Sequence, residues 1–374
     1  MKRILILGAG CAGLSLARAL RFAPVEITLL DRRSGHLDPS KLYVAVFAGP
    51  RGLETPLSEV LTGQKNVQVV QGEAVYLNSR QRRLILADRT LPYDVLVIAT
   101  GSQPRYEREI WQQIAPALKC GDDARRVREK LLDRGTASVI IGGGVAGVEL
   151  ASAVALTNRS RRVVIIESGK RILAGFPQPL AEEAERRLRK LGVELRCGLH
   201  VVGMDAESVR ASGAQGRERF LSRAVLWAGG VEGSGFGAAL HSEAGAALDE
   251  AGRVRVEPDL TLPGHKEIFV IGDLARVLHD GVPLDGLATV AAQQGRYVAS
   301  SIRERLAGYD ARPFEYVDQG RFAILGRGGV GMIGDAQLRG PTAWLAAKLA
   351  QKWSRPTDLL RRLRAYSAAT GSRT

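Results

Sequence analysis

The chain of 374 residues lacks the features that mark several common classes of protein. It has three cysteines, Cys11, Cys120 and Cys197, and none of them forms a close pair such as Cys-x-x-Cys. The sequence therefore encodes neither a redox-active dithiol nor a thiolate metal site, and its five histidines are scattered, so we expect no metal. No stretch reaches the ~20 apolar residues of a membrane span. Aromatic residues make up only 5%, and no RNA- or DNA-binding motif is present, which argues against specific nucleic-acid recognition.

Length and composition indicate a soluble protein of two or three domains. Hydrophobic residues make up 45% and charged residues 25% of the chain, which is too long for a single core. The first residues, MKRILILGAG, have the cations and apolar run of a signal peptide. Glycine spacing and a later acidic residue explain the same stretch as part of a folded domain. We therefore expect a protein that is cytoplasmic or peripheral on a membrane.

A glycine-rich turn near the start predicts a dinucleotide site. We expect a buried strand over Arg3–Leu7, a turn over Gly8–Gly13, a helix over Leu14–Arg21 and a strand over 25–30 that ends beside Asp31. This order and the G-x-G-x-x-G spacing form a dinucleotide-binding fingerprint. The glycines permit a sharp turn, close approach of a pyrophosphate and tight helix packing, and the acid accepts hydrogen bonds from ribose hydroxyls.

The same pattern returns further along the chain. Ser138–Ile141 predicts a strand, Gly142–Gly147 the turn, VELASAVAL the helix, and a second strand ends at Glu167. An acid at that position favours NADH, because it repels the 2′-phosphate of NADPH. Lys170 and Arg171 follow closely and could soften this preference. Two nicotinamide nucleotides would leave no redox partner, so we expect one flavin and one NADH with hydride transfer between them.

Further motifs resemble those of the pyridine nucleotide–disulfide oxidoreductases, flavoproteins with two dinucleotide-binding domains. LPYDVLVIATG (91–101) and AVLWAGGV (224–231) are similar to the strands that lead out of their FAD and NAD domains. EIFVIGD (267–273) resembles their second FAD motif. The disulfide reductases of this fold need a cysteine pair beside the flavin, which this chain lacks. Its electrons must therefore leave the flavin directly.

The C-terminal third narrows the resemblance to the type II NADH dehydrogenases. LATVAAQQGRYVASSI (287–302), FEYVDQGRFAILGRGGVGMIG (314–334) and LRGPTAWLAAKL (338–349) are similar to segments of that family. Its members are single-subunit, contain FAD, lie peripherally on the membrane and pass electrons from NADH to quinone. The resemblance thus implies FAD and NADH as cofactors, a quinone as acceptor and a place on the inner face of the cell membrane.

The implied architecture is an α/β fold with two Rossmann-like dinucleotide-binding domains. We expect an FAD domain over 1–103 and 236–306, with an NAD domain over 104–235 inserted between its two parts. A small C-terminal α+β segment with amphipathic helices, 307–374, would complete the chain and dock on the membrane or a partner.

The resemblance also assigns the cofactor contacts residue by residue. For FAD they are Gly8, Gly10, Cys11, Ala12, Gly13, Asp31, Arg32, Lys41, Ala99, Thr100, Gly101, Gly272, Asp273, Ala288 and Thr289, with Asp273 on the ribitol chain. For NAD they are Gly142, Gly144, Val145, Ala146, Gly147, Glu149, Glu167, Ala228, Gly229 and Gly230.

Three residues are candidates for the catalytic steps. Gln293 and Gln294 are expected to hold a quinone carbonyl, with a satisfied amide pair inside a helix as the alternative. Glu149 lies in the predicted first turn of the NAD helix, where an acid suits the helix dipole, and the resemblance also implies that it lies near the nicotinamide. A role in proton transfer is open. A helix that begins near Leu287 would direct its N–H groups at the reduced flavin.

Departures from the family pattern gather around the expected flavin and quinone sites. Thr289 stands where the family usually has Gln, Ala153 where a second acid is common, and Asp38 and Lys41 where apolar residues are usual. The family has several prolines before the AAQQG motif, and this sequence keeps only Pro283 there. These changes leave the expected NADH oxidation intact. They leave open the identity of the acceptor and the rate of turnover.

Positive charge is concentrated at the C-terminus. The net charge is +14, and residues 339–374 alone carry eight basic and one acidic side chain. Leu345, Leu349 and Trp353 recur at helical spacing, and Pro356 is expected to start a second helix with leucines on one face and arginines opposite. Such helices suit an anionic membrane surface. The alternative is a helix docked on its own domain or on the partner of a homodimer.

Two other functions stay open at this point. A soluble FAD-dependent NAD(P)H reductase could pass its electrons to a small electron-transfer protein, such as a ferredoxin, docked on the basic surface. A redox-sensing flavoprotein could instead bind membrane or nucleic acid through its charge. Rapid NADH-dependent turnover with a short-chain quinone would distinguish an NADH:quinone oxidoreductase from these two alternatives.

Overall fold

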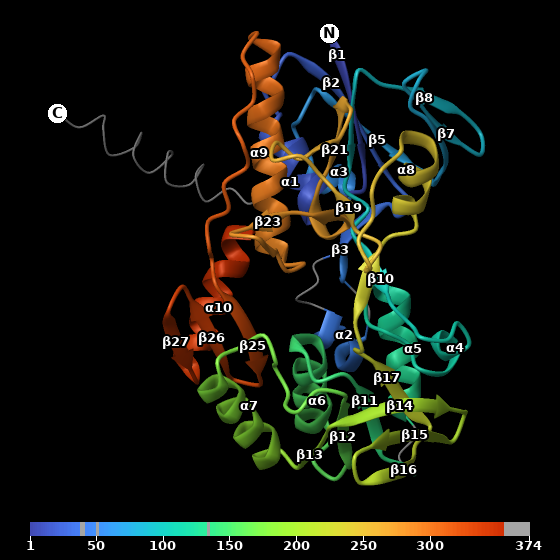
Figure 1. Cartoon of the computed structure of the whole chain (residues 1–374), viewed down its shortest axis with the longest axis vertical. Coiled ribbons are helices and arrows are strands. Elements are labelled where there is room, and N and C mark those ends of the chain that lie inside the picture. The colour runs from blue at the N-terminus through green and yellow to red at the C-terminus, as the bar shows by residue number, and fades with distance from the viewer. Residues whose placement is uncertain (38–41, 50–51, 133–134, 355–374) are drawn as a thin grey trace, which may run out of the picture.

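The computed structural model describes residues 1–37, 42–49, 52–132 and 135–354, and Figure 1 shows two α/β halves stacked one above the other. The upper half contains a six-stranded sheet and the lower half a four-stranded sheet. A small antiparallel sheet flanks the lower half. Each half is therefore built around its own sheet, as two dinucleotide-binding domains require.

The upper sheet has the order β20-β21-β9-β1-β2-β5, in which all strands except the edge strand β20 run parallel. Its strands are β1 (Lys2–Leu7), β2 (Val25–Asp31), β5 (Val67–Gln71), β9 (Val95–Ile98), β20 (Thr261–Leu262) and β21 (His265–Val270). Helices α1 (Cys11–Ala19) and α9 (Ala288–Leu306) pack against each other beside it. Strands from residues 2–98 and from residues 261–270 thus share one sheet.

The lower sheet is parallel, in the order β13-β12-β11-β17. Its strands are β11 (Ser138–Ile141), β12 (Val163–Glu167), β13 (Val193–Cys197) and β17 (Ala224–Trp227), and its helices include α5 (Gly121–Leu132), α6 (Val145–Thr157) and α7 (Gln178–Lys190). A meander of β14 (Leu199–Met204), β15 (Ser208–Gly213) and β16 (Gly216–Leu221) adjoins it.

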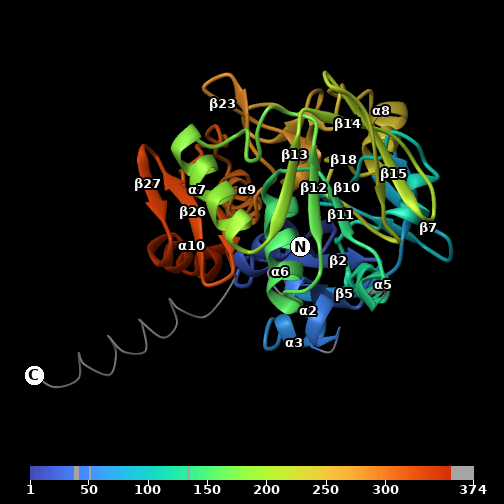
Figure 2. The ribbon, with the colours of Figure 1, turned by 90° about the horizontal axis from the view of Figure 1, so that it is seen from below.

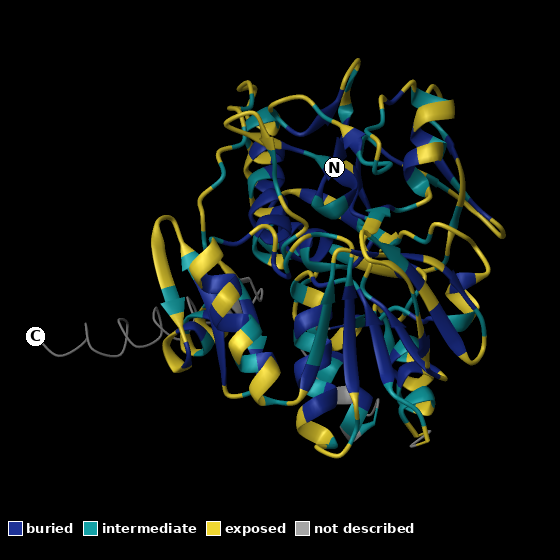
Figure 3. Ribbon diagram, turned by 60° about the horizontal axis from the view of Figure 1, so that its bottom comes forward, coloured by how far each residue is buried: buried dark blue, intermediate teal, exposed yellow. Residues whose placement is uncertain are grey.

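The central strands are apolar wherever they are buried, because both faces of each sheet are covered there. The strand residues Ile4, Leu5 and Ile6 in the upper half, and Val139 and Ile140 in the lower half, are all at most 1% exposed. Continuous runs of Val, Ile and Leu are typical of parallel strands buried on two sides. Figure 3 shows these strands as buried, with exposure confined to outer faces and loops.

Two short strands connect the halves. β10 (Ser102–Pro104) leads out of the upper half, β18 (Val231–Gly233) leads back into it, and the two pair antiparallel. The remaining elements of residues 1–320 are β3 (Gly35–Leu37), α2 (Leu42–Ala48), β4 (Glu54–Pro56), α3 (Leu57–Val60), β6 (Ala74–Asn78), β7 (Arg83–Leu86), β8 (Thr90–Pro92), α4 (Trp111–Ile114), α8 (Phe236–Ala244), β19 (Val254–Arg255), the 3₁₀ turn η2 (Gly272–Leu274), β22 (Ala275–Arg276), β23 (Leu278–His279) and β24 (Val282–Pro283).

The C-terminal segment packs against the lower half. It comprises β25 (Arg321–Leu325), β26 (Gly328–Ile333), β27 (Ala336–Arg339) and α10 (Pro341–Ser354). Ala323, Leu325 and Val330 share one buried core with α6 and α7, and α10 packs on this small sheet and also against α9 of the upper half. None of the helices among the described residues combines the length and hydropathy needed to cross a bilayer.

The expected fold class of two Rossmann-like domains with a C-terminal α+β segment is confirmed. Two helices start earlier than predicted. The helix expected over Leu14–Arg21 is α1, which begins at Cys11, inside the expected turn, and ends at Ala19. The helix expected over 148–156 is α6, which begins at Val145. The helix expected after Pro356 lies outside the described residues. The division at residues 103, 235 and 306 stays a proposal.

Candidate functional site

The two glycine turns have the same backbone geometry. Gly8 and Gly142, the first glycine of each turn, have φ angles of +107° and +106°. A Cβ added at Gly8 would lie 2.3 Å from the Ala99 carbonyl oxygen, and one at Gly142 would lie 2.3 Å from that of Ala228. Only glycine fits these positions, because the left-handed conformation and the neighbouring strand both exclude a side chain.

The other glycines of each turn either allow close packing or leave space for a ligand. A Cβ at Gly13 would lie 1.9 Å from the Gly8 carbonyl oxygen, and one at Gly147 1.9 Å from that of Gly142. Gly10 and Gly144, by contrast, would meet nothing within 4 Å. Both cap a helix N-terminus with nearly equal angles, φ −73° and −70°. Each turn is therefore an open cradle at a helix N-terminus, which fits the pyrophosphate of a dinucleotide.

An acidic side chain is held against the middle of each turn. The Ala9 N–H donates to Asp31 Oδ2 at 2.7 Å, and the Gly143 N–H donates to Glu167 Oε2 at 2.6 Å. The second oxygen of Glu167 accepts from the Gly169 N–H at 2.6 Å. Both acids, which the sequence singled out, thus lie beside the cradle where a ribose would be bound.

The strand ends predicted to contact the cofactors also lie beside the turns. The Ala99 N–H donates to the Leu7 carbonyl and the Ala228 N–H to the Ile141 carbonyl, both at 2.7 Å. Ala99–Gly101 and Ala228–Gly230 therefore leave their sheets next to the first and second turn respectively. The structure brings these predicted contacts together in matching positions.

The second FAD motif lies at the end of β21, where the turn η2 contacts α9. Asp273 Oδ2 accepts a hydrogen bond from Ser102 Oγ at 2.8 Å, and Ser102 Oγ accepts one from Lys119 Nζ at 3.1 Å. A cavity of about 170 Å³ is lined by Ser102, Asp273, Gly286, Leu287 and other residues around the start of α9. The sequence did not single out Ser102 or Lys119, because neither belongs to a motif.

Both glutamines of the AAQQG motif are buried and paired with backbone. Gln294 Oε1 accepts from the Gly272 N–H at 2.6 Å, which ties α9 to the second FAD motif. Gln293 forms two bonds of 3.0 Å with the backbone of Val317 through both ends of its amide. The structure thus pairs these amides in the way that the alternative interpretation described. Ala288 is exposed and Thr289 half-buried at the start of the helix.

Glu149 connects three segments that are distant in sequence. The prediction that it lies in the first turn of its helix is wrong, because α6 begins at Val145 and places it one turn further on. Its Oε1 accepts from the Ile324 N–H at 2.8 Å, and its side chain also bonds to Tyr43. Burial raises the pKa of Glu149 from 4.5 to about 7, opposed by these two bonds and by Lys348. Burial beside Glu149 also raises the pKa of Tyr43 strongly. Sequence motifs pointed to neither Tyr43 nor Ile324 as a partner of Glu149.

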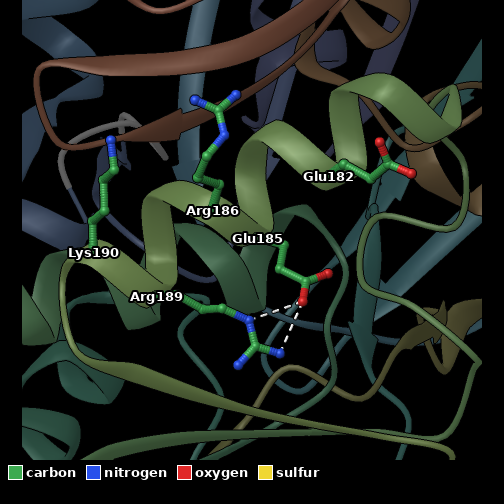
Figure 4. Close-up of a pocket in the computed structure, with 5 residues that line it drawn as sticks. All are labelled: Glu182, Glu185, Arg186, Arg189 and Lys190. Carbon is green, nitrogen blue, oxygen red and sulfur yellow. Dashed lines mark hydrogen bonds and ion pairs between the residues drawn. The ribbon is translucent and has the colours of Figure 1, made fainter.

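Of the remaining residues that the sequence singled out near the flavin, the structure describes one. Arg32 is exposed, and Lys41 and Asp38 lie outside the described residues. Among the residues that the structure describes, no three His, Cys, Asp or Glu side chains gather where they could hold a metal. A wide hollow on α7 is lined by charged side chains of that helix alone, including a pair of Glu185 and Arg189 (Figure 4). We assign it no role in the site.

Comparison with known proteins places this geometry in a family. The pyridine nucleotide-disulphide oxidoreductases match residues 2–295. A type II NADH:quinone oxidoreductase of Mycobacterium tuberculosis, Ndh, is 32% identical over 92% of this chain and 82% of its own length. A second protein of that organism, NdhA, is 33% identical over 92% of this chain and 81% of its own. The chain belongs to the pyridine nucleotide-disulphide oxidoreductase family. Its membership in the type II NADH:quinone oxidoreductases, which the sequence motifs suggested, is confirmed.

Solved structures of the family and its neighbours share the fold. NDH2 from Plasmodium falciparum, in complex with NADH, superposes with a TM-score of 0.81 at 15% identity, over 94% of this chain and 96% of that one. The sulfide:quinone oxidoreductase of Aquifex aeolicus gives 0.81 at 17% identity, over 94% and 90%. At these identities the likeness shows the fold, and the family membership rests on the sequence matches.

Proposed function

We propose that this type II NADH:quinone oxidoreductase homologue binds FAD in its first turn and NADH in its second, and reduces a quinone. The observation that carries the proposal is the pair of matching cradles, each with an acid at its centre, in a chain of this family. When bound, FAD supplies the group that accepts a hydride and releases electrons singly or in pairs. The absence of a close cysteine pair in the sequence supports direct transfer to the acceptor.

The chain's own residues bind and orient the two nucleotides. Asp31 and Glu167 offer carboxylate oxygens to ribose hydroxyls, and Glu167 disfavours a 2′-phosphate by charge repulsion. Asp273 contributes to FAD binding, where Ser102 and Lys119 hold its carboxylate. The N-terminus of α9, beside this motif, stabilises negative charge on the flavin side of the site.

The acceptor side is proposed to lie around the start of α9. Thr289, half-buried there, contributes to the surface that a quinone meets, and Gln293 and Gln294, buried one turn further along the helix, support that surface from beneath. The glutamines act here by holding the Val317 and Gly272 backbones in place. Glu149, whose pKa of about 7 lets it carry a proton at neutral pH, is the residue best suited to proton exchange near the nicotinamide.

We further propose that the C-terminal segment attaches the protein to the inner face of the membrane. On α10, Leu345 and Leu349 are 55% and 50% exposed, and Lys348 lies beside the Trp344 ring at 6.0 Å. Exposed leucines, a partly exposed tryptophan and an exposed lysine on one helix fit an anionic bilayer surface. A lipid-soluble acceptor would be met there.

Anaerobic titration of the purified protein tests the proposed function. NADH should bleach the flavin absorbance at lower concentrations than NADPH, and ubiquinone or menaquinone analogues should restore it in repeated turnovers. Turnover with a small acidic electron-transfer protein and none with quinones would instead favour the soluble reductase. Colourless protein that takes up no flavin and ignores NADH would overturn the proposal.

A further inference from the structure

Gly143, at the centre of the second turn, is held through both its backbone N–H and its carbonyl. The Gly143 N–H donates to Glu167 Oε2 at 2.6 Å, and the Gly143 carbonyl accepts from the Leu173 N–H at 2.8 Å. The Ile172 side chain also packs on Gly143, since a Cβ added there would lie 2.9 Å from its Cγ2. The segment that follows Glu167 therefore sets the orientation of the turn.

This contact requires an unfavourable backbone at Leu173. Its φ angle is +50°, in the left-handed region that a leucine rarely adopts, and the residue is 2% exposed. Such a conformation persists only where the surroundings over-determine it, and it is found most often next to functional sites. Something must hold the segment closed for the Leu173 N–H to reach the turn.

Arg171 provides that restraint through four backbone carbonyls. Its Nη1 donates to Ile172 at 3.3 Å and to Leu173 at 2.7 Å, and its Nη2 donates to Ala174 at 3.1 Å and to Phe176 at 2.7 Å. A guanidinium has donors in a rigid plane and is always charged, so it can gather several carbonyls around itself. The guanidinium is thus engaged by its own loop, residues 171–176.

The first turn is held by a different device. The Ala9 carbonyl, which corresponds to that of Gly143, lies 3.0 Å from the ring Nδ1 of His36. A histidine side chain therefore takes the place that the Leu173 N–H has in the second turn. Because the two turns share their other geometry, a change at Arg171 should affect one nucleotide and spare the other.

We propose that Arg171 is a positioning residue for NADH, which acts by closing the 171–176 loop so that Leu173 fixes the Gly143 peptide. This inference rests on the proposed function for its nucleotide. It also corrects the expectation that Arg171 softens the preference for NADH over NADPH. A guanidinium bonded to four carbonyls is not free to bind a 2′-phosphate, so of these two cations it is the exposed Lys170 that is left for that role.

Three variants of the FAD-loaded protein test the proposal: Arg171→Gln, Arg171→Lys and the matched control Lys170→Gln. The dissociation constants of NADH and of ADP-ribose, which binds the turn without redox chemistry, are measured for each. Arg171→Gln should weaken both by about tenfold, equivalent to ~1.4 kcal/mol. Its FAD content and its kcat at saturating NADH should stay within about twofold of the unaltered protein. Arg171→Lys should recover part of the loss, and Lys170→Gln should bind NADH normally.

Several outcomes would overturn this role. Unchanged NADH and ADP-ribose binding in Arg171→Gln would show that the loop does not position the turn. A loss confined to NADPH would show that the guanidinium contacts the 2′-phosphate after all. If Arg171→Gln does not fold, Arg171→Lys provides the test. Normal NADH affinity of that variant would show that the four bonds of the guanidinium are not needed to position the turn. Unaltered protein that binds no NADH would instead overturn the proposed function.

Discussion

At the scale of single residues, one turn needs glycine for two opposite reasons. Gly147 has no room for a side chain, because an added Cβ would lie 1.9 Å from the Gly142 carbonyl oxygen. Gly144 faces empty space, with no atom within 4 Å of an added Cβ and a φ of −70° that any residue adopts. Gly147 is therefore required for packing of the protein itself, and Gly144 leaves space for a ligand.

Alanine substitutions should separate these two reasons. Gly147→Ala forces helix α6 away from the turn and should lower the free energy of unfolding by roughly 2 kcal/mol. Gly144→Ala should lower it by less than about 1 kcal/mol yet weaken NADH binding by about tenfold, because its methyl group occupies the phosphate cradle. Denaturant unfolding and NADH titration of both variants provide the measurements. Normal NADH affinity in Gly144→Ala would show that the pyrophosphate lies elsewhere.

A buried acid makes stability depend on pH in a defined window. The pKa of Glu149 is raised by burial from 4.5 to about 7, so between these values the folded protein holds a proton that the unfolded chain releases. Stability should therefore fall as pH rises from about 4.5 to 7 and then level off. Glu149→Gln keeps an acceptor for the Ile324 N–H without ionising, so its stability relative to the unaltered protein should grow over this window by at most ~3 kcal/mol.

Thermal unfolding of both proteins across this pH range isolates the contribution of Glu149, because every other titrating group is shared. A stability difference that does not change with pH would show that Glu149 titrates at its ordinary pKa. It would also remove the basis for proton exchange at neutral pH.

At the scale of elements, the crossing of α1 and α9 sets the FAD cradle. α1 begins at the first glycine turn and α9 carries the AAQQG motif, so this one contact joins the two parts of the FAD site. Gly295 lies at the crossing, where an added Cβ would be 2.3 Å from the Ala12 carbonyl oxygen and 3.0 Å from the Leu16 nitrogen. Backbone that approaches this closely leaves no space for any side chain.

Gly295→Ala should therefore push the two helices apart. We expect a loss of roughly 2 kcal/mol or more in unfolding free energy and a reduced FAD content in the purified protein. Ser300→Ala, an exposed position on the same helix, serves as the control and should change stability by less than about 0.5 kcal/mol. Flavin absorbance per protein and denaturant unfolding measure both effects. Full FAD content in Gly295→Ala would show that the cradle does not depend on this crossing.

At the scale of the whole molecule, the C-terminal segment joins the NAD half to a candidate membrane surface. Its strands β25 and β26 pack on α6 and α7, and the Glu149 carboxylate bonds to the β25 backbone. Its helix α10 meanwhile exposes Leu345 and Leu349. The same short segment thus contacts the nucleotide-binding half on one side and offers an apolar surface on the other.

The double variant Leu345→Asp, Leu349→Asp should lose co-sedimentation with anionic liposomes, while its NADH-dependent reduction of a soluble quinone analogue is retained. Negative charge is repelled by anionic lipid, and the apolar contact is lost. Val202→Asp together with Leu221→Asp is the matched control, because these residues are 40% and 64% exposed on the β14–β16 meander, away from α10. Equal liposome binding by both double variants would rule out α10 as the docking surface.

Local sequence patterns predicted the fold to a large extent. The two turns, their flanking strands and the acids after them follow from spacing within about 30 residues, because glycine geometry and apolar strands are local requirements. The start of α9 near Leu287 also follows from sequence. Errors arose at helix starts, since α1 begins three residues before the prediction and Glu149 lies beyond the first turn of α6.

What the sequence by itself determined is the presence of two dinucleotide cradles, the acid that belongs to each, and the family. Only the tertiary structure decided what the remaining polar side chains contact. Gln293 bonds to Val317, Glu149 to Ile324, and Arg171 to its own loop. The physical reason is that a buried polar group must find a partner wherever packing provides one. Neither a contact between distant segments nor the closing of a loop such as 171–176 leaves a motif in the sequence.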